Sequence, residues 1–163
     1  MIDDYLKAHK NFGVILDTNV FLLYLVGNYD KEFIKDFKRT VKYDEEDFDW
    51  LNLYVGYFSS LFVTPQILAE AWNLFEKISE PKFSAFLNST LQIFKVVDEE
   101  YVHKDDVILN ESFSYVGVTD TSIIEAAGNL NLLVITDDFR SFSYYANQGV
   151  SVINLNQLKS RYL

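Results

Sequence analysis

The chain contains no cysteine and few of the residues that interrupt regular structure: 2 Pro and 6 Gly among 163 residues. The absence of cysteine excludes disulfides, thiolate nucleophiles and zinc sites built on cysteine. No repeat, low-complexity tract or Pro/Gly-rich linker divides the sequence. We therefore expect a single domain that spans residues 1–163.

Long apolar runs are missing as well. No stretch approaches the roughly 18 uncharged apolar residues that a membrane-spanning helix needs. The first residues, MIDDYLKAHKN, are charged and lack the apolar core of a secretory signal. We therefore expect a cytoplasmic protein that does not associate with membranes.

Basic residues are outnumbered, with 14 Lys and Arg against 24 Asp and Glu, for a net charge of −10. This balance argues against broad, nonspecific binding of polyanions, because such binding depends on Lys and Arg at the phosphates. It does not exclude a phosphodiester substrate, since metal ions can offset an acidic pocket. Several basic residues also gather in one short segment, at Lys31, Lys35, Lys38, Arg39 and Lys42.

Several familiar catalytic patterns are absent too. The sequence has no glycine-rich phosphate loop and no nucleophile elbow. His9 and His103 are isolated from each other and from any metal-ligand spacing, so we expect both at the surface. Acidic residues are thus the main candidates for chemistry.

The apolar residues, 49% of the chain, are arranged in short runs that alternate with helical patterns. Continuous runs of Val, Ile and Leu predict strands that are buried on both faces, as in a parallel sheet covered by helices. The expected strands are 13–17, 61–63, 95–97, 132–136 and 150–154. The expected helices are 18–26, 31–40, 46–59, 65–78, 81–94, 119–128 and 139–147, with a short one at the C-terminus.

Acidic residues occupy the places where such a fold would bring them together. Asp17 follows the first strand, and Asp137 and Asp138 follow the strand 132–136. Glu70 and Asp120 lie early in helices that can reach the same edge. Ligands of open parallel sheets bind beyond the carboxyl ends of the strands. Clustered carboxylates repel one another and persist mainly around a cation, so the pattern predicts a site for a hard ion such as Mg²⁺ or Mn²⁺.

Each acid also has an interpretation that requires no site. Asp17 and Asp120 precede helices and could simply cap them. Glu70 shares a helical face with apolar residues and could be a rim residue paired with a lysine. Side chains alternate along a strand, so we expect only one of Asp137 and Asp138 to reach the site directly. Thr136 is a plausible hydrogen-bonding partner within it.

The residues resemble one known family. The matching stretches are GVILDTNVFL (13–22), FVTPQILAEAWN (62–73), GVTDTSIIEAA (117–127), LLVITDDF (132–139) and GVSVINLNQL (149–158). Taken in this order, they resemble the PIN domain, the fold of many prokaryotic metal-dependent ribonucleases, including toxins of the VapBC type.

This resemblance implies an α/β fold, a three-layer α/β/α sandwich with a parallel sheet of about five strands. It also implies endonucleolytic hydrolysis of RNA with Mg²⁺ or Mn²⁺, and a possible toxin role in which an antitoxin protein or a second copy of the chain is a partner. Carried over residue by residue, it makes Asp17, Glu70, Asp120 and Asp138 catalytic. Asp17, Asp120 and Asp138 would bind metal, with Asp137 as an extra carboxylate, and Asn19 and Thr136 would support them.

The interval between Asp17 and Glu70 is longer than in the small toxin members of the family. The excess is a helical insertion at about residues 28–60, which could serve as a lid, a dimer element or a partner surface. Its basic residues Lys31, Lys35, Lys38 and Arg39 are candidates for contact with the RNA backbone.

Two other functions fit the same sequence. A non-catalytic PIN-like module would bind RNA or a protein through the insertion. A phosphatase of the haloacid-dehalogenase kind would use Asp17 as a nucleophile, although such enzymes usually carry another Asp two residues later, where this chain has Asn19.

Overall fold

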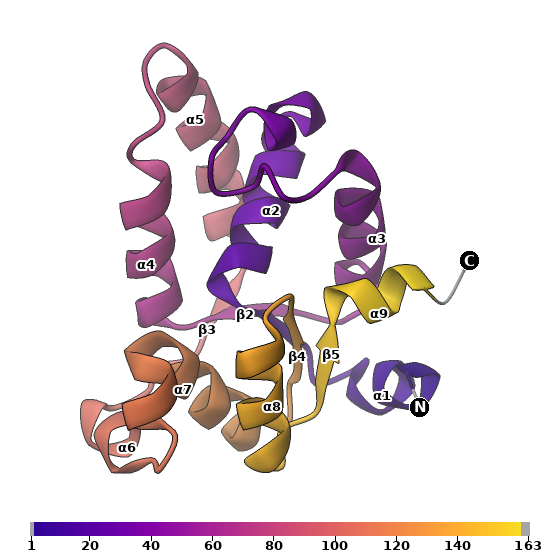
Figure 1. Cartoon of the computed structure of the whole chain (residues 1–163), viewed down its shortest axis with the longest axis vertical. Coiled ribbons are helices and arrows are strands. Elements are labelled where there is room, and N and C mark those ends of the chain that lie inside the picture. Colours follow the sequence, from indigo (N-terminus) through magenta and orange to yellow (C-terminus); the bar gives the residue numbers. More distant parts are fainter. Residues whose placement is uncertain (1, 161–163) are drawn as a thin grey trace.

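The computed structural model describes residues 2–160, which form a three-layer α/β/α sandwich around a five-stranded parallel sheet (Figure 1). The α/β class expected from the sequence is therefore confirmed. The strands are β1 (Val14–Leu16), β2 (Leu61–Val63), β3 (Asp98–Glu99), β4 (Leu133–Thr136) and β5 (Val152–Asn154). Their order in the sheet is β3-β2-β1-β4-β5, and every neighbouring pair is parallel.

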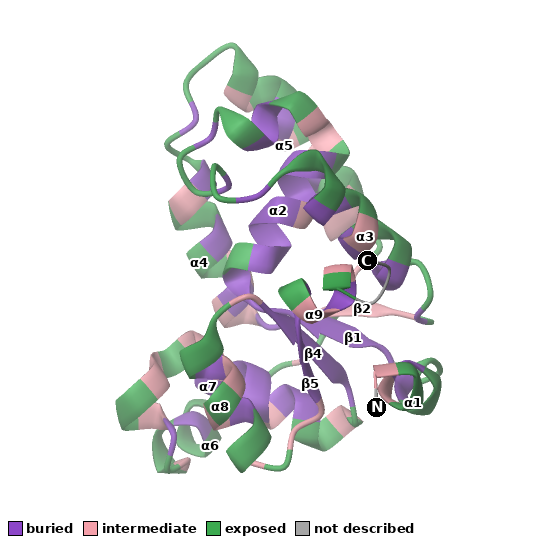
Figure 2. Cartoon of the chain, turned by 45° about the vertical axis from the view of Figure 1, so that its right-hand side comes forward, coloured by how far each residue is buried: buried purple, intermediate pink, exposed green. Residues whose placement is uncertain are grey.

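The central strands β1 and β4 are buried along their whole length, as Figure 2 shows. Ile15 pairs with Phe62 on one side and with Val134 on the other, and Ile135 pairs with Ile153. Such strands bury both faces, which explains their continuous Val, Ile and Leu composition.

Helices cover the sheet in two groups, with the strands between them (Figure 2). The first group is α2 (Thr18–Tyr29), α3 (Glu45–Val55), α4 (Pro65–Phe75) and α5 (Lys82–Phe94). The second group is α6 (Lys104–Leu109), α7 (Phe113–Leu130) and α8 (Phe139–Asn147). The terminal helices are α1 (Ile2–His9) and α9 (Leu155–Lys159).

Aromatic side chains fill the space among α2, α4 and α5. The ring centroids of Phe75 and Phe86 lie 5.2 Å apart, and those of Phe21 and Phe94 lie 6.2 Å apart. Phe21, Phe75 and Phe86 are fully buried. These rings therefore form core, and they anchor α2, whose first turn begins at the candidate site.

The insertion at 28–60 packs against the domain through a short 3-10 helix, η1 (Lys31–Lys35), and through α3. Gly27 makes close packing possible, because a Cβ there would lie 2.1 Å from the ring of Phe48 on α3. The helix expected over 18–26 continues through Gly27 to Tyr29. This glycine serves a helix–helix contact that the local sequence does not reveal.

Other boundaries also differ from the sequence-based expectation. The helix expected over 31–40 is the shorter η1 followed by turns, and the third strand lies at 98–99. An additional helical turn begins at Phe113, and non-helical backbone at Gly117, where φ is 83°, separates it from the segment expected over 119–128. His9 is buried, with Nδ1 2.7 Å from the carbonyl oxygen of Asn131, so the expectation of a surface position for it is wrong.

Within residues 2–160, no helix is both long and apolar enough to cross a membrane.

Candidate active site

The strand order places a crevice between the carboxyl ends of β1 and β4. The chain passes from β1 to β2 and β3 on one side and then returns to β4 on the other side of β1. Ligands of open α/β sheets bind at such a switch point. Asp17 is the first residue beyond β1 and Asp137 the first beyond β4, and the amide of Asp17 donates to the carbonyl oxygen of Ile135 at 3.1 Å.

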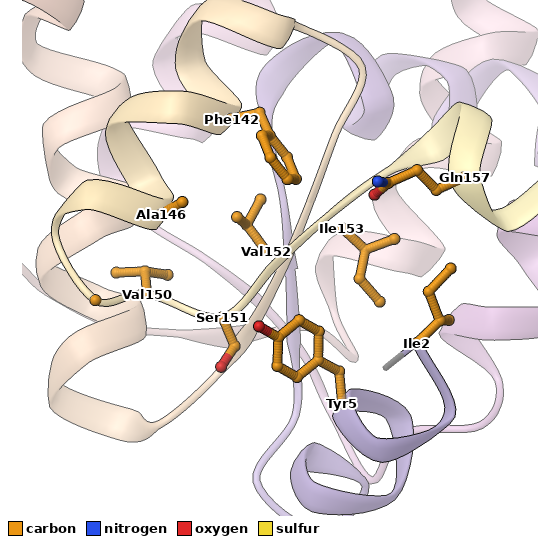
Figure 3. A pocket seen from close by; sticks show the side chains of 10 residues that line it. Ile2, Tyr5, Phe142, Ala146, Val150, Ser151, Val152, Ile153 and Gln157 are labelled. Atoms are coloured by element: carbon orange, nitrogen blue, oxygen red, sulfur yellow. The ribbon is translucent and has the colours of Figure 1, made fainter.

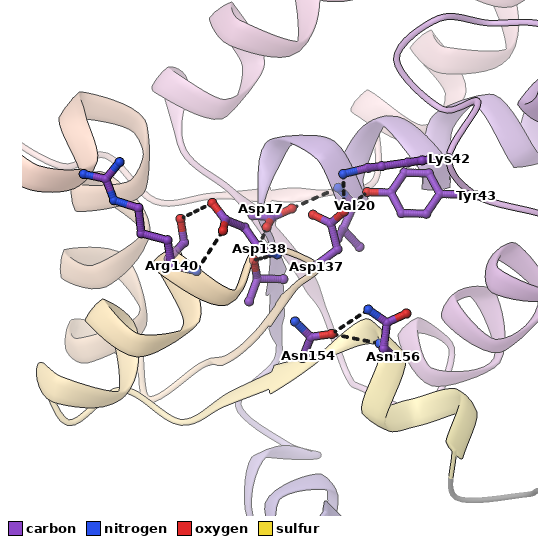
Figure 4. Close-up of polar contacts among 11 residues, drawn as sticks. Asp17, Val20, Lys42, Tyr43, Asp137, Asp138, Arg140, Asn154 and Asn156 are labelled. Carbon is purple, nitrogen blue, oxygen red and sulfur yellow. Dashed lines mark hydrogen bonds and ion pairs between the residues drawn. The ribbon is translucent and has the colours of Figure 1, made fainter.

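Asp17 is buried, with 5% of its surface exposed, and both its oxygens accept hydrogen bonds. Oδ1 accepts from the amide of Val20 at 2.9 Å and thereby caps α2, and Oδ2 accepts from the Thr136 hydroxyl (Figure 4). The pKa of Asp17 is raised to about 7, chiefly by burial and also by the charges of Asp137 and Asp120, whereas the two hydrogen bonds lower it. The cap interpretation is therefore correct, and it leaves a buried acid whose charged form a bound cation would stabilise.

Asp120 lies in the first turn after the Gly117 kink and faces α8. Its carboxylate accepts from the Ser141 hydroxyl and from the Tyr145 hydroxyl, each at 2.9 Å. Burial raises the pKa of Asp120, and the charges of Glu70 and Asp138 add to this, whereas the two hydrogen bonds lower it. Asp120 is thus held by two neutral hydroxyl groups and has no cationic partner within residues 2–160.

Asp138 caps α8 and shares a hydroxyl group with Asp120. It accepts from the amide of Arg140 at 2.8 Å and from the Ser141 hydroxyl at 3.1 Å. A hydroxyl has one hydrogen to donate, so Ser141 serves one of the two acids at a time. The other oxygen lone pairs of the two carboxylates remain available to a ligand between them.

Glu70 approaches from α4, and the start of that helix is tied to α7. Thr64 caps α4 by accepting from the amide of Ile67 at 3.2 Å, and its hydroxyl lies 2.8 Å from that of Ser122. Glu70 is exposed, and among the described residues it forms no ion pair, so the interpretation as a lysine-paired rim residue is wrong. The capping contact instead aims the first turns of α4 at the same crevice.

These acids surround one small cavity of about 110 Å³. It is lined by Asp17, Thr18, Asn19, Glu70, Asp120, Asp138 and Ser141. Four carboxylates and no Lys or Arg line the cavity, which has room for an ion together with water. The buried hydroxyl of Thr18 also has no hydrogen-bond partner within residues 2–160.

The donor set fits a hard divalent cation. Carboxylate, amide and hydroxyl oxygens are ligands that Mg²⁺ and Mn²⁺ prefer. Across residues 2–160, no three carboxylate or imidazole groups already converge as a finished metal site. The four acids instead stand around a hollow, as expected of like charges that repel one another.

The two neighbouring acids after β4 diverge. Asp138 lines the cavity, whereas Asp137 is absent from its lining and points to the insertion. There the Tyr43 hydroxyl donates to Asp137 Oδ2 at 2.6 Å, and the Lys42 ammonium forms an ion pair with the same oxygen (Figure 4). Thr136 does not line the cavity either and acts through its bond to Asp17.

The four basic residues expected to contact RNA, Lys31, Lys35, Lys38 and Arg39, do not line this cavity. Lys31 pairs with Asp49 at 2.5 Å. Lys31 and Lys35 bound η1 and the other two follow it, past the far end of α2, whose 12 residues span roughly 18 Å. The distal basic cluster is the name used below for Lys31, Lys35, Lys38 and Arg39.

Sequence reasoning missed four side chains that contact the acids: Lys42, Tyr43, Ser141 and Tyr145. The sequence could have indicated Ser141 and Tyr145. They follow Asp138 by three and by seven residues, a spacing that places them on one face of the expected helix 139–147. Lys42 and Tyr43 had no such signal, since they meet Asp137 across about ninety residues of sequence.

A different hollow, of about 260 Å³, lies between α1, α8 and β5 (Figure 3). Its lining is mostly apolar, with Phe142, Val152 and Ile153 among its members, and it includes no charged side chain. Within residues 2–160 its lining contains no carboxylate, imidazole or ammonium group, whereas four carboxylates line the smaller cavity, which is therefore the candidate active site.

Comparison with known proteins extends the fold assignment only. No protein-family model matches the sequence, and no curated protein matches it. The chain is similar to the crystal structure of PAE2754 from Pyrobaculum aerophilum, with a TM-score of 0.55 and 14% identity over 93% of this chain and 96% of that one. The likeness spans both chains nearly end to end and shows that they share a fold.

Proposed function

We propose that this protein is a metal-dependent endoribonuclease of the PIN type, which hydrolyses RNA phosphodiester bonds with a divalent cation bound by carboxylates. One observation carries the proposal. Asp17, Glu70, Asp120 and Asp138 come from four separate segments and surround one cavity at the switch point of the sheet. Helix capping accounts for Asp17 and Asp138 one by one, but it does not require four acids without cationic partners around one hollow.

Each side chain would have a distinct part. Asp17, Asp120 and Asp138 would hold Mg²⁺ or Mn²⁺, because hydrogen bonds fix each carboxylate. Val20 and Thr136 hold Asp17. Ser141 and Tyr145 hold Asp120, and the capping contact with α8 holds Asp138. When bound, the ion supplies an activated water and stabilises charge on the phosphate. Glu70 is exposed across the cavity and would orient that water and accept its proton. Asn19, exposed at the rim, would offer its amide to the substrate.

The phosphatase alternative loses support from the residue two positions after Asp17. That residue is Asn19, which lines the cavity where such enzymes usually carry a second Asp. The proposal also includes a toxin role with an antitoxin protein as partner, and a homodimer. Both rest on the PIN resemblance alone. Light scattering of the purified chain, with and without proteins that co-purify, tests both partners.

The test is Mn²⁺-dependent cleavage of a pool of single-stranded and structured RNAs. The wild type is compared with Asp17→Asn and with Asp98→Asn, which changes an exposed acid on the edge strand β3. We expect cleavage by the wild type and by Asp98→Asn and none by Asp17→Asn. Equal cleavage by all three would identify a contaminating nuclease, and absence of both cleavage and Mn²⁺ binding would favour the non-catalytic module.

A further inference from the structure

The insertion places the ammonium group of Lys42 beside Asp137, just beyond the end of β4 and outside the carboxylate cavity. Lys42 and Tyr43 are adjacent in sequence, and both contact Asp137 Oδ2, by an ion pair and by a hydrogen bond of 2.6 Å (Figure 4). The Lys42 ammonium also lies 5.0 Å from the centroid of the Tyr43 ring. The side chain of Asp137 is only 8% exposed, so this pair is the principal partner of a nearly buried charge.

The backbone around Lys42 and Tyr43 is fixed on both sides. The hydroxyl of the buried Thr40 donates to the carbonyl oxygen of Ile34 at 2.8 Å, and the amide of Tyr43 donates to the carbonyl oxygen of Thr40 at 2.9 Å. The next residue, Asp44, caps α3 in a reciprocal capping box with Asp47. The ammonium is therefore presented by an ordered turn, although the Lys42 side chain is about half exposed.

Asp137 and Asp17 are neighbours at the ends of paired strands. Leu16 pairs with Ile135, and each acid follows within two residues of its member of that pair. Both donors to Asp137 use Oδ2, and Oδ1 is buried without a hydrogen-bond partner within residues 2–160. Two arrangements follow: Oδ1 joins Asp17 in holding a second metal ion, or the Lys42 ammonium already supplies the positive charge at that place.

We propose that the Lys42 ammonium stands in the place of a second divalent ion, so that the site takes one ion, on the cavity side of Asp17. This inference rests on the proposed function and deepens it. A second ion held by Asp137 Oδ1 would share its carboxylate with the Lys42 ammonium. Repulsion between the two cations disfavours that position. The Tyr43 hydroxyl contributes by holding Asp137 toward Lys42.

The experiment is a titration with Mn²⁺, followed by calorimetry and by the electron paramagnetic resonance signal of free Mn²⁺. The proteins are wild type, Lys42→Met, and the control Lys95→Met, which removes an exposed lysine at the end of α5. We expect wild type and Lys95→Met to bind one ion with equal affinity. Lys42→Met should bind a second ion, or bind the first about tenfold more tightly or better, because an opposing charge is gone.

Asp137→Asn should change Mn²⁺ affinity in the opposite direction to Lys42→Met. It distinguishes an Asp137 that neutralises Lys42 from an Asp137 that binds the metal. Alone, it leaves the ammonium uncompensated and should weaken Mn²⁺ binding. Combined with Lys42→Met, it should restore the affinity of the wild type for one ion. If Asp137 is itself a metal ligand, the double variant stays weak and the inference is wrong. Thermal unfolding in EDTA checks that each variant is folded.

The remaining outcomes separate this inference from the proposed function. Two ions bound by the wild type would overturn the role of Lys42 and leave a metal-dependent nuclease intact. One ion with unchanged affinity in Lys42→Met would do the same. No Mn²⁺ bound by the wild type would overturn the proposed function, and the inference with it.

Discussion

Asp17 should make the metal-free protein less stable as the pH rises. Its pKa is raised from 3.8 to about 7 in the folded protein, because burial disfavours the charged carboxylate. A raised carboxyl pKa means that the folded state binds the proton more tightly than the unfolded chain. The stability that this proton provides is therefore complete below about pH 4 and is lost as the pH rises to about 7.

The size of the effect follows from the shift. Each pKa unit corresponds to 1.36 kcal/mol, so a shift of about three units makes the charged carboxylate cost about 4 kcal/mol. Asp17→Asn keeps an oxygen to cap α2 and carries no charge. In EDTA at pH 8 the variant should exceed the wild type in free energy of unfolding by up to about 4 kcal/mol, and the difference should shrink toward zero near pH 4.

Urea denaturation at a series of pH values in EDTA measures this difference. The comparison of wild type with Asp17→Asn isolates Asp17, since the other acids, Asp120 included, titrate in both proteins. Added Mn²⁺ should reverse the order at pH 8, because the ion stabilises only a folded protein that binds it. Parallel pH profiles of the two proteins in EDTA would refute the reasoning.

Three further perturbations test the packing and the site. Gly27→Ala should destabilise the protein by about 1–3 kcal/mol, because the added Cβ clashes with Phe48. Gly128→Ala, whose Cβ would meet no atom within 4 Å, should stabilise it by about 0.5–1 kcal/mol. Urea denaturation measures both changes. Tyr145→Phe removes one of the two hydroxyls that hold Asp120, and calorimetry should show weaker Mn²⁺ binding with the fold retained, whereas unchanged affinity would contradict its positioning role. Neutralising the distal basic cluster should weaken RNA binding and flatten its salt dependence, yet leave the single-turnover cleavage rate of bound RNA unchanged; a large loss of that rate would place the cluster at the chemistry.

Local sequence patterns determined the elements that lie next to the site. The helix α4, capped by Thr64, begins at residue 65 and α8 spans 139–147, both as expected. These predictions succeeded because capping, proline geometry and short apolar runs act within a few residues. The position of Asp17 beyond β1 follows from the same local logic, and so does the alternation that directs Asp137 and Asp138 apart.

Long-range contacts account for what sequence reasoning missed. Gly27 resembles a helix breaker until α3 lies against α2. The helical turn that begins at Phe113 was missed, and the non-helical backbone at Gly117 separates it from the segment expected over 119–128. Asp120 consequently lies in a first turn without being the capping residue, and its partners Ser141 and Tyr145 come from a different helix.

The sequence by itself determined the α/β class, the parallel sheet and the four acids that stand around the cavity, because hydrophobic periodicity and strand ends are local properties. Only the tertiary structure decided how those acids are held, which of two adjacent aspartates lines the cavity, and that Lys42 and Tyr43 meet Asp137. Such contacts form between segments that are far apart in the sequence. Local sequence patterns therefore do not reveal which residues will pack against one another.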